Sequence, residues 1–154
     1  MMPCVPIIDL LRAGVTTPHP DSARCATWLA SVYESIRGAG GAVTTSVEDP
    51  TVGRNYHRTG VRLSDGTPLY VLLNSAAALV AAAQPRDPHL ITLLFADVPG
   101  GEIYRRAGLR VATAEELEQP IEDRYLQLLT DEERRDVAYH RPGRLGDLLF
   151  NWFD

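Results

Sequence analysis

The segment spanning residues 55–74 limits the possible folds more than any other part of the sequence. Two runs of β-forming residues flank the pair Asp65-Gly66, which is the strongest local signal for a β-hairpin. Residues 69–73 are apolar at every position, as is typical of a strand that is covered on both faces. We therefore expect this hairpin to form the centre of a sheet, with residues 69–73 as its most buried strand.

A two-residue turn at Asp65-Gly66 also determines how the two predicted strands pair. Each step away from the turn adds one residue to each strand, so Val61 faces Tyr70 and His57 faces Asn74. One face of the predicted hairpin then carries seven side chains, which are His57, Thr59, Val61, Leu63, Tyr70, Leu72 and Asn74. Arg58 projects from the opposite face.

A helix and a first strand are predicted before the hairpin. Asp21 can cap a helix that runs to Arg37, because apolar residues recur there at helical spacing and Gly38 follows as a stop signal. Residues 42–47 then form the first strand. The apolar stripe of the helix consists of Cys25, Leu29, Val32 and Ile36, and we expect its neighbours Trp28 and Tyr33 to be buried.

A second helix and a fourth strand are predicted after the hairpin. Asn74 and Ser75 are good N-cap residues for an alanine-rich helix that runs to about Ala83, and Pro85 ends it. Residues 90–95 form another apolar strand, and a connection of this length is typical of a right-handed parallel crossover. The predicted fold class is therefore α+β, or mixed α/β, with a central four-stranded mixed sheet in the order helix-β-β-β-helix-β.

The 154 residues are expected to form a single domain with three parts. Residues 1–20 form an N-terminal arm, residues 21–98 the sheet core, and residues 99–154 a helical C-terminal part that consists of a group of short helices. Two capping-box patterns, which begin at Thr113 and at Thr130, predict helix starts in this last part. A final helix is predicted over residues 145–153.

Composition excludes several classes of function. The net charge is −5, so a general nucleic-acid binder is disfavoured. The 15 basic residues are all arginine, which excludes lysine chemistry such as Schiff-base formation and is typical of a GC-rich bacterial genome. The two cysteines, Cys4 and Cys25, have no cysteine or histidine neighbour at metal-ligand spacing. We expect neither a metal nor another cofactor.

The cellular location is predicted from the same features. Residues 1–15 lack the basic start and the unbroken apolar core of a signal peptide, and no run approaches the roughly 18 apolar residues of a membrane span. Two cysteines are too few for a disulfide framework. These features favour a cytoplasmic protein without a membrane segment.

One convergent group of polar side chains can be built from the predicted sheet. Ligands of open sheets bind beyond the carboxyl ends of parallel strands, here the strands at 69–73 and 90–95. His57 and Asp97 are candidates for an oriented general base at this edge, and Arg58 is a candidate for holding an anionic group. The candidate binding residues beside them are Thr59, Asn74 and Ser75.

Two functions from different classes remain open. The preferred one is a small accessory protein, such as an immunity-type or regulatory factor, that binds another protein or forms a homodimer. The alternative is a small enzyme that acts on an anionic substrate through His57, Asp97 and Arg58. The last predicted helix supports the first function. It carries more large apolar residues than docking on one sheet requires, and Phe150 and Phe153 are the additional ones. Both are candidate partner-binding residues, unless the short helices after position 113 bury them.

Overall fold

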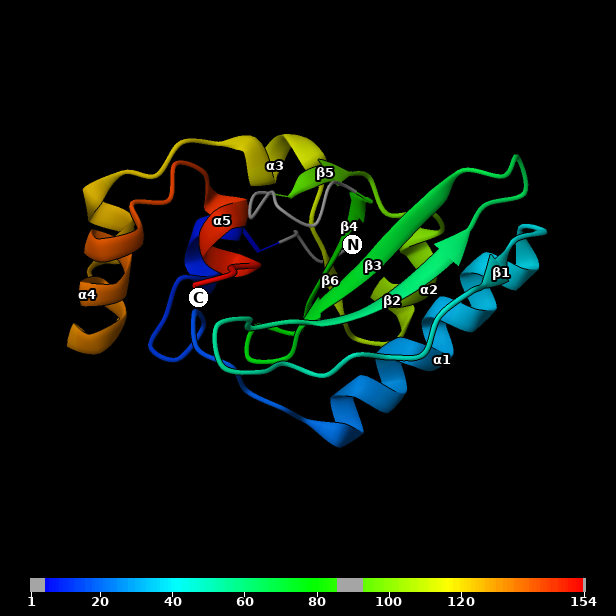
Figure 1. The fold of residues 1–154 in the computed structure, drawn as a ribbon, viewed down its shortest axis with the longest axis horizontal. Coiled ribbons are helices and arrows are strands. Elements are labelled where there is room, and N and C mark those ends of the chain that lie inside the picture. Colours follow the sequence, from blue (N-terminus) through cyan, green and yellow to red (C-terminus); the bar gives the residue numbers. More distant parts are fainter. Residues whose placement is uncertain (1–4, 86–92, 154) are drawn as a thin grey trace.

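The computed structural model describes residues 5–85 and 93–153, in which helices flank a mixed sheet of six strands (Figure 1). The order across the sheet is β1-β2-β3-β4-β5, and β6 also pairs with β4. The β4–β6 pair is parallel, whereas the pairs along the main order are antiparallel. The strands are β1 (Ala42–Val43), β2 (His57–Arg62), β3 (Pro68–Asn74), β4 (Leu79–Gln84), β5 (Leu94–Ala96) and β6 (Arg110–Val111). The predicted α+β class with a mixed sheet is confirmed, although the sheet has more strands than expected.

The helices begin largely where the sequence contains caps. The side chain of Asp21 accepts a hydrogen bond from the backbone N–H of Arg24, and both predicted capping boxes, at Thr113 and Thr130, are formed. None of the helices in the described ranges is long and apolar enough to cross a bilayer. They are η1 (Ile7–Leu10), α1 (Ser22–Gly38), α2 (Gly101–Arg106), α3 (Ala114–Glu118), η2 (Asp123–Leu126), α4 (Asp131–His140) and α5 (Leu145–Leu149), of which η1 and η2 are 3-10 helices.

Each face of the sheet carries its own hydrophobic core. On one face, Trp28, Val32 and Ile36 of α1 pack with Val71 of β3 and Tyr104 of α2. The other face is covered by the N-terminal segment and by the C-terminal part of the chain, through residues that include Leu11, Leu117, Leu145, Leu149 and Phe150. The strand β3 therefore lies between two cores, as the unbroken apolar run at 69–73 predicts.

The observed hairpin register differs by one residue from the predicted register. Val61 faces Leu69, and His57 faces Leu73 instead of Asn74. The connection contains three residues instead of two: Leu63 and Thr67 share a backbone hydrogen bond, and Gly66 has a φ of 90°. A left-handed glycine at the end of a three-residue loop forms a bulge, and this adds the residue that shifts the pairing. As a result His57, Thr59 and Val61 share a face with Leu69, Val71 and Leu73.

The segment predicted as an alanine-rich helix is a turn and a strand. A turn at residues 75–78 leads directly into β4, which pairs antiparallel with β3. Alanines favour helices when exposed, but Ala81, Ala82 and Ala83 are fully buried in the sheet, whose two faces are both covered. The predicted parallel crossover from β3 is therefore wrong. The strand predicted at 90–95 corresponds in part to β5, and residues 90–92 lie outside the described part of the chain.

Three further expectations are corrected. Trp28 is buried as predicted, but Tyr33 is 42% exposed because it lies on the outer side of α1. The part of the chain after residue 99 is not wholly helical, since β6 joins the sheet there. The last helix, α5, ends at Leu149 instead of residue 153, so Phe150 and Phe153 follow it in an irregular segment.

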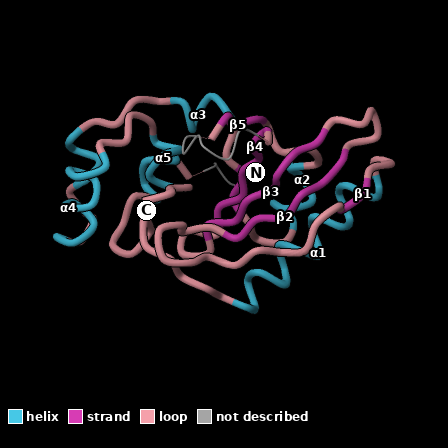
Figure 2. The backbone as a smooth tube through the Cα atoms, viewed as in Figure 1, coloured by secondary structure: helices cyan, strands magenta, loops and turns pink. Residues whose placement is uncertain are grey.

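The connection between β1 and β2 shapes one edge of the sheet. Residues 44–56 leave β1, run back along β2 and turn before entering it (Figure 2). Glu48 and Arg58 form an antiparallel bridge within this region, with backbone hydrogen bonds of 2.9 Å in both directions. This bridge places Asp49 beside the first residue of β2, His57.

Candidate functional site

His57 is almost completely buried at the start of β2, with 1% of its surface exposed. Its Nδ1 lies 3.0 Å from Oδ1 of Asp49, whose side chain is 69% exposed. Because a carboxylate can only accept, this contact places the ring proton on Nδ1 and leaves a lone pair on Nε2. Within the described residues Nε2 has no hydrogen-bond partner.

Cys25 completes a cluster of three titratable side chains. It lies in the first turns of α1, and one donor atom each of Cys25, Asp49 and His57 lies within 4.8 Å of the other two. All three line a pocket of about 390 Å³, which we call the Cys25–His57 pocket. The other lining residues are Pro20, Asp21, Ser22, Ala26, Leu29 and Val47. Three separate segments, α1, the loop before β2 and β2 itself, therefore build this site.

The surroundings of the pocket keep both the thiol and the imidazole neutral. Burial raises the pKa of Cys25, and the negative charges of Asp49 and Asp21 raise it further. Burial also lowers the pKa of His57, against the opposing effect of its hydrogen bond to Asp49. The pocket thus combines a neutral sulfur and nitrogen donor with the carboxylates of Asp49 and Asp21, and it favours a positively charged occupant.

The predicted catalytic group of His57, Asp97 and Arg58 does not come together. Asp97 follows β5, which β3 and β4 separate from β2, so three strand spacings, roughly 14 Å, lie between it and His57. Its carboxylate accepts a hydrogen bond of 2.9 Å from the backbone of Ala114 at the start of α3. Asp49 takes the place that was predicted for Asp97.

Arg58 lies on the opposite face of β2, as predicted, and is held by neighbours there. Its Nε bonds to the carboxylate of Glu48, and its Cζ lies 5.1 Å from the ring centroid of Tyr70 and 5.8 Å from that of Trp152. Burial lowers the pKa of Arg58, but the ion pair with Glu48 and the other neighbouring groups outweigh it, so the pKa is raised. Arg58 is therefore not positioned to hold an anion next to His57.

Thr59, Asn74 and Ser75 all bond to backbone carbonyl oxygens. The hydroxyl of Thr59 donates to Thr45 at 3.0 Å, and that of Ser75 donates to His19. The amide nitrogen of Asn74 donates to the carbonyls of Val15 and Leu149 at 3.0 and 2.7 Å. In these positions Asn74 and Ser75 join the N-terminal and C-terminal segments to the sheet, and Thr59 holds the connection between β1 and β2.

Asn74 belongs to a larger set that we call the polar clamp, formed by Asn55, Asn74, Asn151 and Glu133. Asn55 donates to the same two carbonyls as Asn74 and accepts from the backbone N–H of Asn151 at 2.8 Å. Asn151 donates to the carbonyls of Thr16 and Leu148. The side-chain nitrogen of each of these three amides donates two hydrogen bonds, so the clamp is a structural device.

Glu133 anchors the other end of the clamp although it is fully buried. It accepts backbone hydrogen bonds from Gly14, Thr16 and Thr130 at 2.8 to 3.0 Å, and a hydroxyl bond of 2.6 Å from Thr16. Burial opposes ionisation, but these four bonds outweigh it and hold the pKa of Glu133 below its usual value. A carboxylate with this many donors stays charged at neutral pH.

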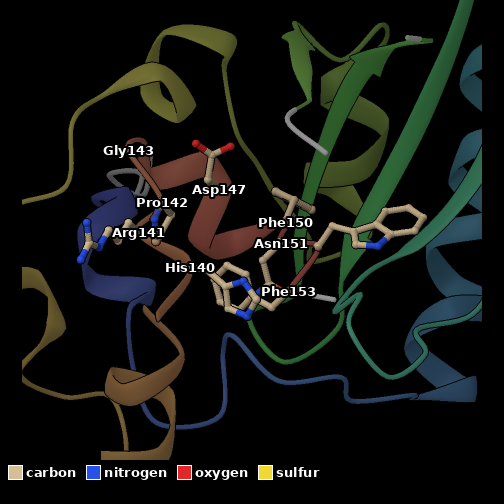
Figure 3. A pocket seen from close by; sticks show the side chains of 9 residues that line it. His140, Arg141, Pro142, Gly143, Asp147, Phe150, Asn151 and Phe153 are labelled. Atoms are coloured by element: carbon tan, nitrogen blue, oxygen red, sulfur yellow. The ribbon is translucent and has the colours of Figure 1, made fainter. Parts of the chain in front are cut away.

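The two predicted binding rings occupy different environments. Phe150 is 2% exposed and packs against Tyr56 and Phe95 at 6.0 and 6.2 Å between centroids, so it is a core residue and not a surface anchor. Phe153 is half-buried and its ring stacks on that of His140, 4.6 Å away and nearly parallel (Figure 3). Both rings line a recess of about 140 Å³, together with Asp147 and Asn151 among other residues.

The sequence contains only weak signals for the observed site. Cys25, Asp49 and His57 are far apart along the chain and follow no motif spacing. The hairpin pattern could place His57 at a strand end, but the neighbouring carboxylate comes from an irregular loop whose path depends on the bridge between Glu48 and Arg58. Comparison with known proteins adds no assignment: it found no family model, no curated protein and no solved structure that matches the chain.

Proposed function

We propose that this chain is a cytoplasmic accessory protein that works by binding another protein. The binding surface is a set of side chains that we call the aromatic strip, formed by Tyr139, His140, Phe153, Trp152 and Arg58. The observation that carries the proposal is the partial exposure of large rings around one recess, which His140, Trp152 and Phe153 line. Tryptophan, tyrosine and arginine are the residues that most often carry binding energy at protein interfaces.

Contacts connect the members of the strip in two groups, which meet at the recess. Tyr139 is 82% exposed and meets His140 edge-on at 4.9 Å between ring centroids. His140 stacks on Phe153, and the adjacent Trp152 is 37% exposed. Arg58 lies beside Trp152 and continues the strip to Tyr70. These contacts hold the rings in fixed positions, which lowers the entropy cost of binding a partner.

The recess described above lies within the strip and supplies a place for an anchor. Figure 3 shows Phe153 and His140 side by side, with Asp147 projecting from α5 on another side of the recess. The Asp147 carboxylate accepts a hydrogen bond of 2.6 Å from Arg144, so its negative charge at the recess is paired. A recess of about 140 Å³ suits one apolar side chain of a partner.

Trp152 is supported from beneath by the buried Arg54. The Arg54 Cζ lies 5.7 Å from the indole centroid, and Arg54 and Trp152 form an antiparallel bridge. A ring that is held by neighbours and still partly exposed is a typical interface anchor. A partner would cover the exposed part of the indole.

A site-specific crosslinking experiment tests the proposal. A photo-reactive phenylalanine analogue is placed at Tyr139 in cells of the native host, and the matched control carries it at Tyr33, which is exposed on α1 outside the strip. We expect a crosslinked protein from position 139 and none from position 33. A crosslink between two copies identifies a homodimer, whereas equal products at both positions contradict the proposal.

Binding of the purified partner then gives the energetic test. Trp152→Ala is expected to weaken binding about 30-fold, which corresponds to about 2 kcal/mol, whereas Tyr33→Ala leaves it unchanged. The melting temperature of each variant confirms that it is folded. Equal affinity of the wild-type chain and the Trp152→Ala variant would show that the strip is not the interface.

A further inference from the structure

Cys25, Asp49 and His57 bring three different kinds of metal-binding atom to one pocket. A thiol sulfur, a carboxylate oxygen and an imidazole nitrogen lie within 4.8 Å of one another. The His57 ring lines the pocket and is almost fully buried, and its Nδ1 lies 3.0 Å from Oδ1 of Asp49. Nδ1 is therefore the nitrogen that lies next to the carboxylate in this cluster.

We propose that Cys25, Asp49 and His57 form a binding site for a divalent cation of the zinc class. Thiolate, imidazole and carboxylate are the ligands that zinc uses in proteins, and three protein ligands leave one position for water or a substrate. Magnesium and calcium are disfavoured, because both prefer sites made wholly of oxygen. This inference concerns the Cys25–His57 pocket and is independent of the aromatic strip.

The geometry requires only a small adjustment to hold the ion. In a tetrahedral zinc site the sulfur and nitrogen ligands are roughly 3.5 Å apart, which is about 1 Å closer than the widest spacing that the cluster allows. A rotation of the Cys25 side chain would supply this movement. The Asp49 side chain, which is mostly exposed and lies in the loop before β2, can follow the ion.

Asp49 lies beside the histidine nitrogen that would bind the ion. Its Oδ1 is 3.0 Å from Nδ1 of His57, and a cation between the two would replace the proton of this hydrogen bond. The ion would then be held by Nδ1 of His57, the carboxylate of Asp49 and the sulfur of Cys25. Removal of the negative charge of Asp49 therefore weakens the site.

The electrostatics of the pocket favour a cation over a reactive thiol. Burial and the carboxylates of Asp49 and Asp21 raise the pKa of Cys25, whereas a catalytic thiol needs a lowered pKa. The same negative surroundings stabilise a divalent cation, whose charge in turn favours the thiolate. Binding therefore releases the thiol proton, and the affinity is expected to increase with pH.

Cobalt titration of the metal-free protein is the direct test. All variants carry Cys4→Ser, so that Cys25 is the single thiol. We expect one equivalent of Co²⁺ to bind and to give a thiolate-to-cobalt charge-transfer absorption band. Zinc competition then gives the affinity for Zn²⁺. Cys25→Ser should abolish the band and weaken Zn²⁺ binding at least about 100-fold, and Asp49→Asn should weaken it roughly 10- to 100-fold.

The matched control is Asp123→Asn, which changes an exposed aspartate in η2 and should leave the affinity unchanged. Absence of saturable Co²⁺ binding overturns the proposal, and so does an unchanged affinity in Cys25→Ser. If a variant unfolds, alkylation of Cys25 in the Cys4→Ser protein decides the question. One equivalent of Zn²⁺ should slow the reaction with iodoacetamide at least tenfold, and an unchanged rate refutes the site.

Discussion

The polar clamp and the Cys25–His57 pocket both contain buried polar side chains, yet their hydrogen bonding differs. In the clamp, the side-chain nitrogens of Asn55 and Asn151 each donate two hydrogen bonds, and Glu133 accepts four. His57, only two residues beyond Asn55, has one ring nitrogen without a partner among the described residues, and so has the neighbouring Trp28. Polar groups with several partners hold the fold together, whereas titratable groups that gather at a pocket are available for a ligand.

The largest expected effect comes from removing the carboxylate of the clamp. Glu133→Ala leaves the backbone donors of Gly14, Thr16 and Thr130 without an acceptor inside the protein. We expect a loss of about 3–5 kcal/mol in the free energy of unfolding, measured by urea denaturation. The control Glu132→Ala changes the exposed neighbour and should stay within about 0.5 kcal/mol of wild type. A similar loss of stability in both variants would show that the hydrogen bonds of Glu133 do not stabilise the fold.

The pH dependence of stability tests the same carboxylate without deleting it. Because the folded-state pKa of Glu133 lies below its unfolded value, ionised Glu133 stabilises the fold above the unfolded pKa of about 4.3. This contribution is lost as the pH falls through the lower, folded-state pKa. The stability difference between wild type and Glu133→Gln should therefore shrink on acidification. A difference that stays constant between neutral pH and pH 3 would contradict the assignment.

A single amide of the clamp should matter less than the carboxylate. Asn151→Ala removes the donors to the carbonyls of Thr16 and Leu148, and both carbonyls are then left in a buried region. We expect a loss of about 1–3 kcal/mol by urea denaturation. Gln127→Ala, which shortens an exposed amide, is the control and should have almost no effect. If Asn151→Ala changed the free energy of unfolding as little as Gln127→Ala, the hydrogen bonds of this amide would not be a source of stability.

The smallest effect on stability is expected in the pocket. His57→Phe keeps an aromatic ring, loses a hydrogen bond to the exposed Asp49 and removes the unpaired nitrogen, so the loss should be under about 1 kcal/mol at pH 8. The folded-state pKa of His57 is lowered, so protonation favours the unfolded chain and stability falls as the pH drops below the unfolded value of about 6.5. This decline should be absent in the variant. A loss at pH 8 as large as that of Asn151→Ala would make His57 a structural residue.

Local patterns predicted the elements whose signals lie within a few residues. The cap at Asp21, the capping boxes at Thr113 and Thr130, and the central strand are all found. The hairpin was predicted at the right place, but its register depends on whether Gly66 ends a two- or a three-residue loop. Because of this one-residue difference, His57 shares a face of the hairpin with Val71 and Leu73 instead of with Tyr70 and Leu72.

Predictions failed where burial overrides propensity. The alanines at 81–83 favour a helix in isolation, but their small side chains allow β4 to lie between two closely packed layers. The same holds near the C-terminus, where Gly146 permits α5 to approach the sheet: a Cβ there would lie 2.3 Å from the ring of Phe95. Such close approaches depend on partners that are distant in the sequence.

The α+β class, the hairpin with its doubly covered strand, and most helix starts can be read from the sequence alone, because they follow from periodicity and from hydrogen bonds within one turn of chain. The composition of the two polar clusters depends on tertiary contacts. Asp97 and Asp49 are both aspartates near strand ends, and no local property distinguishes them as the partner of His57. The bridge between Glu48 and Arg58 makes that choice, because it fixes the loop before β2 and thereby places Asp49 within hydrogen-bonding distance of the ring.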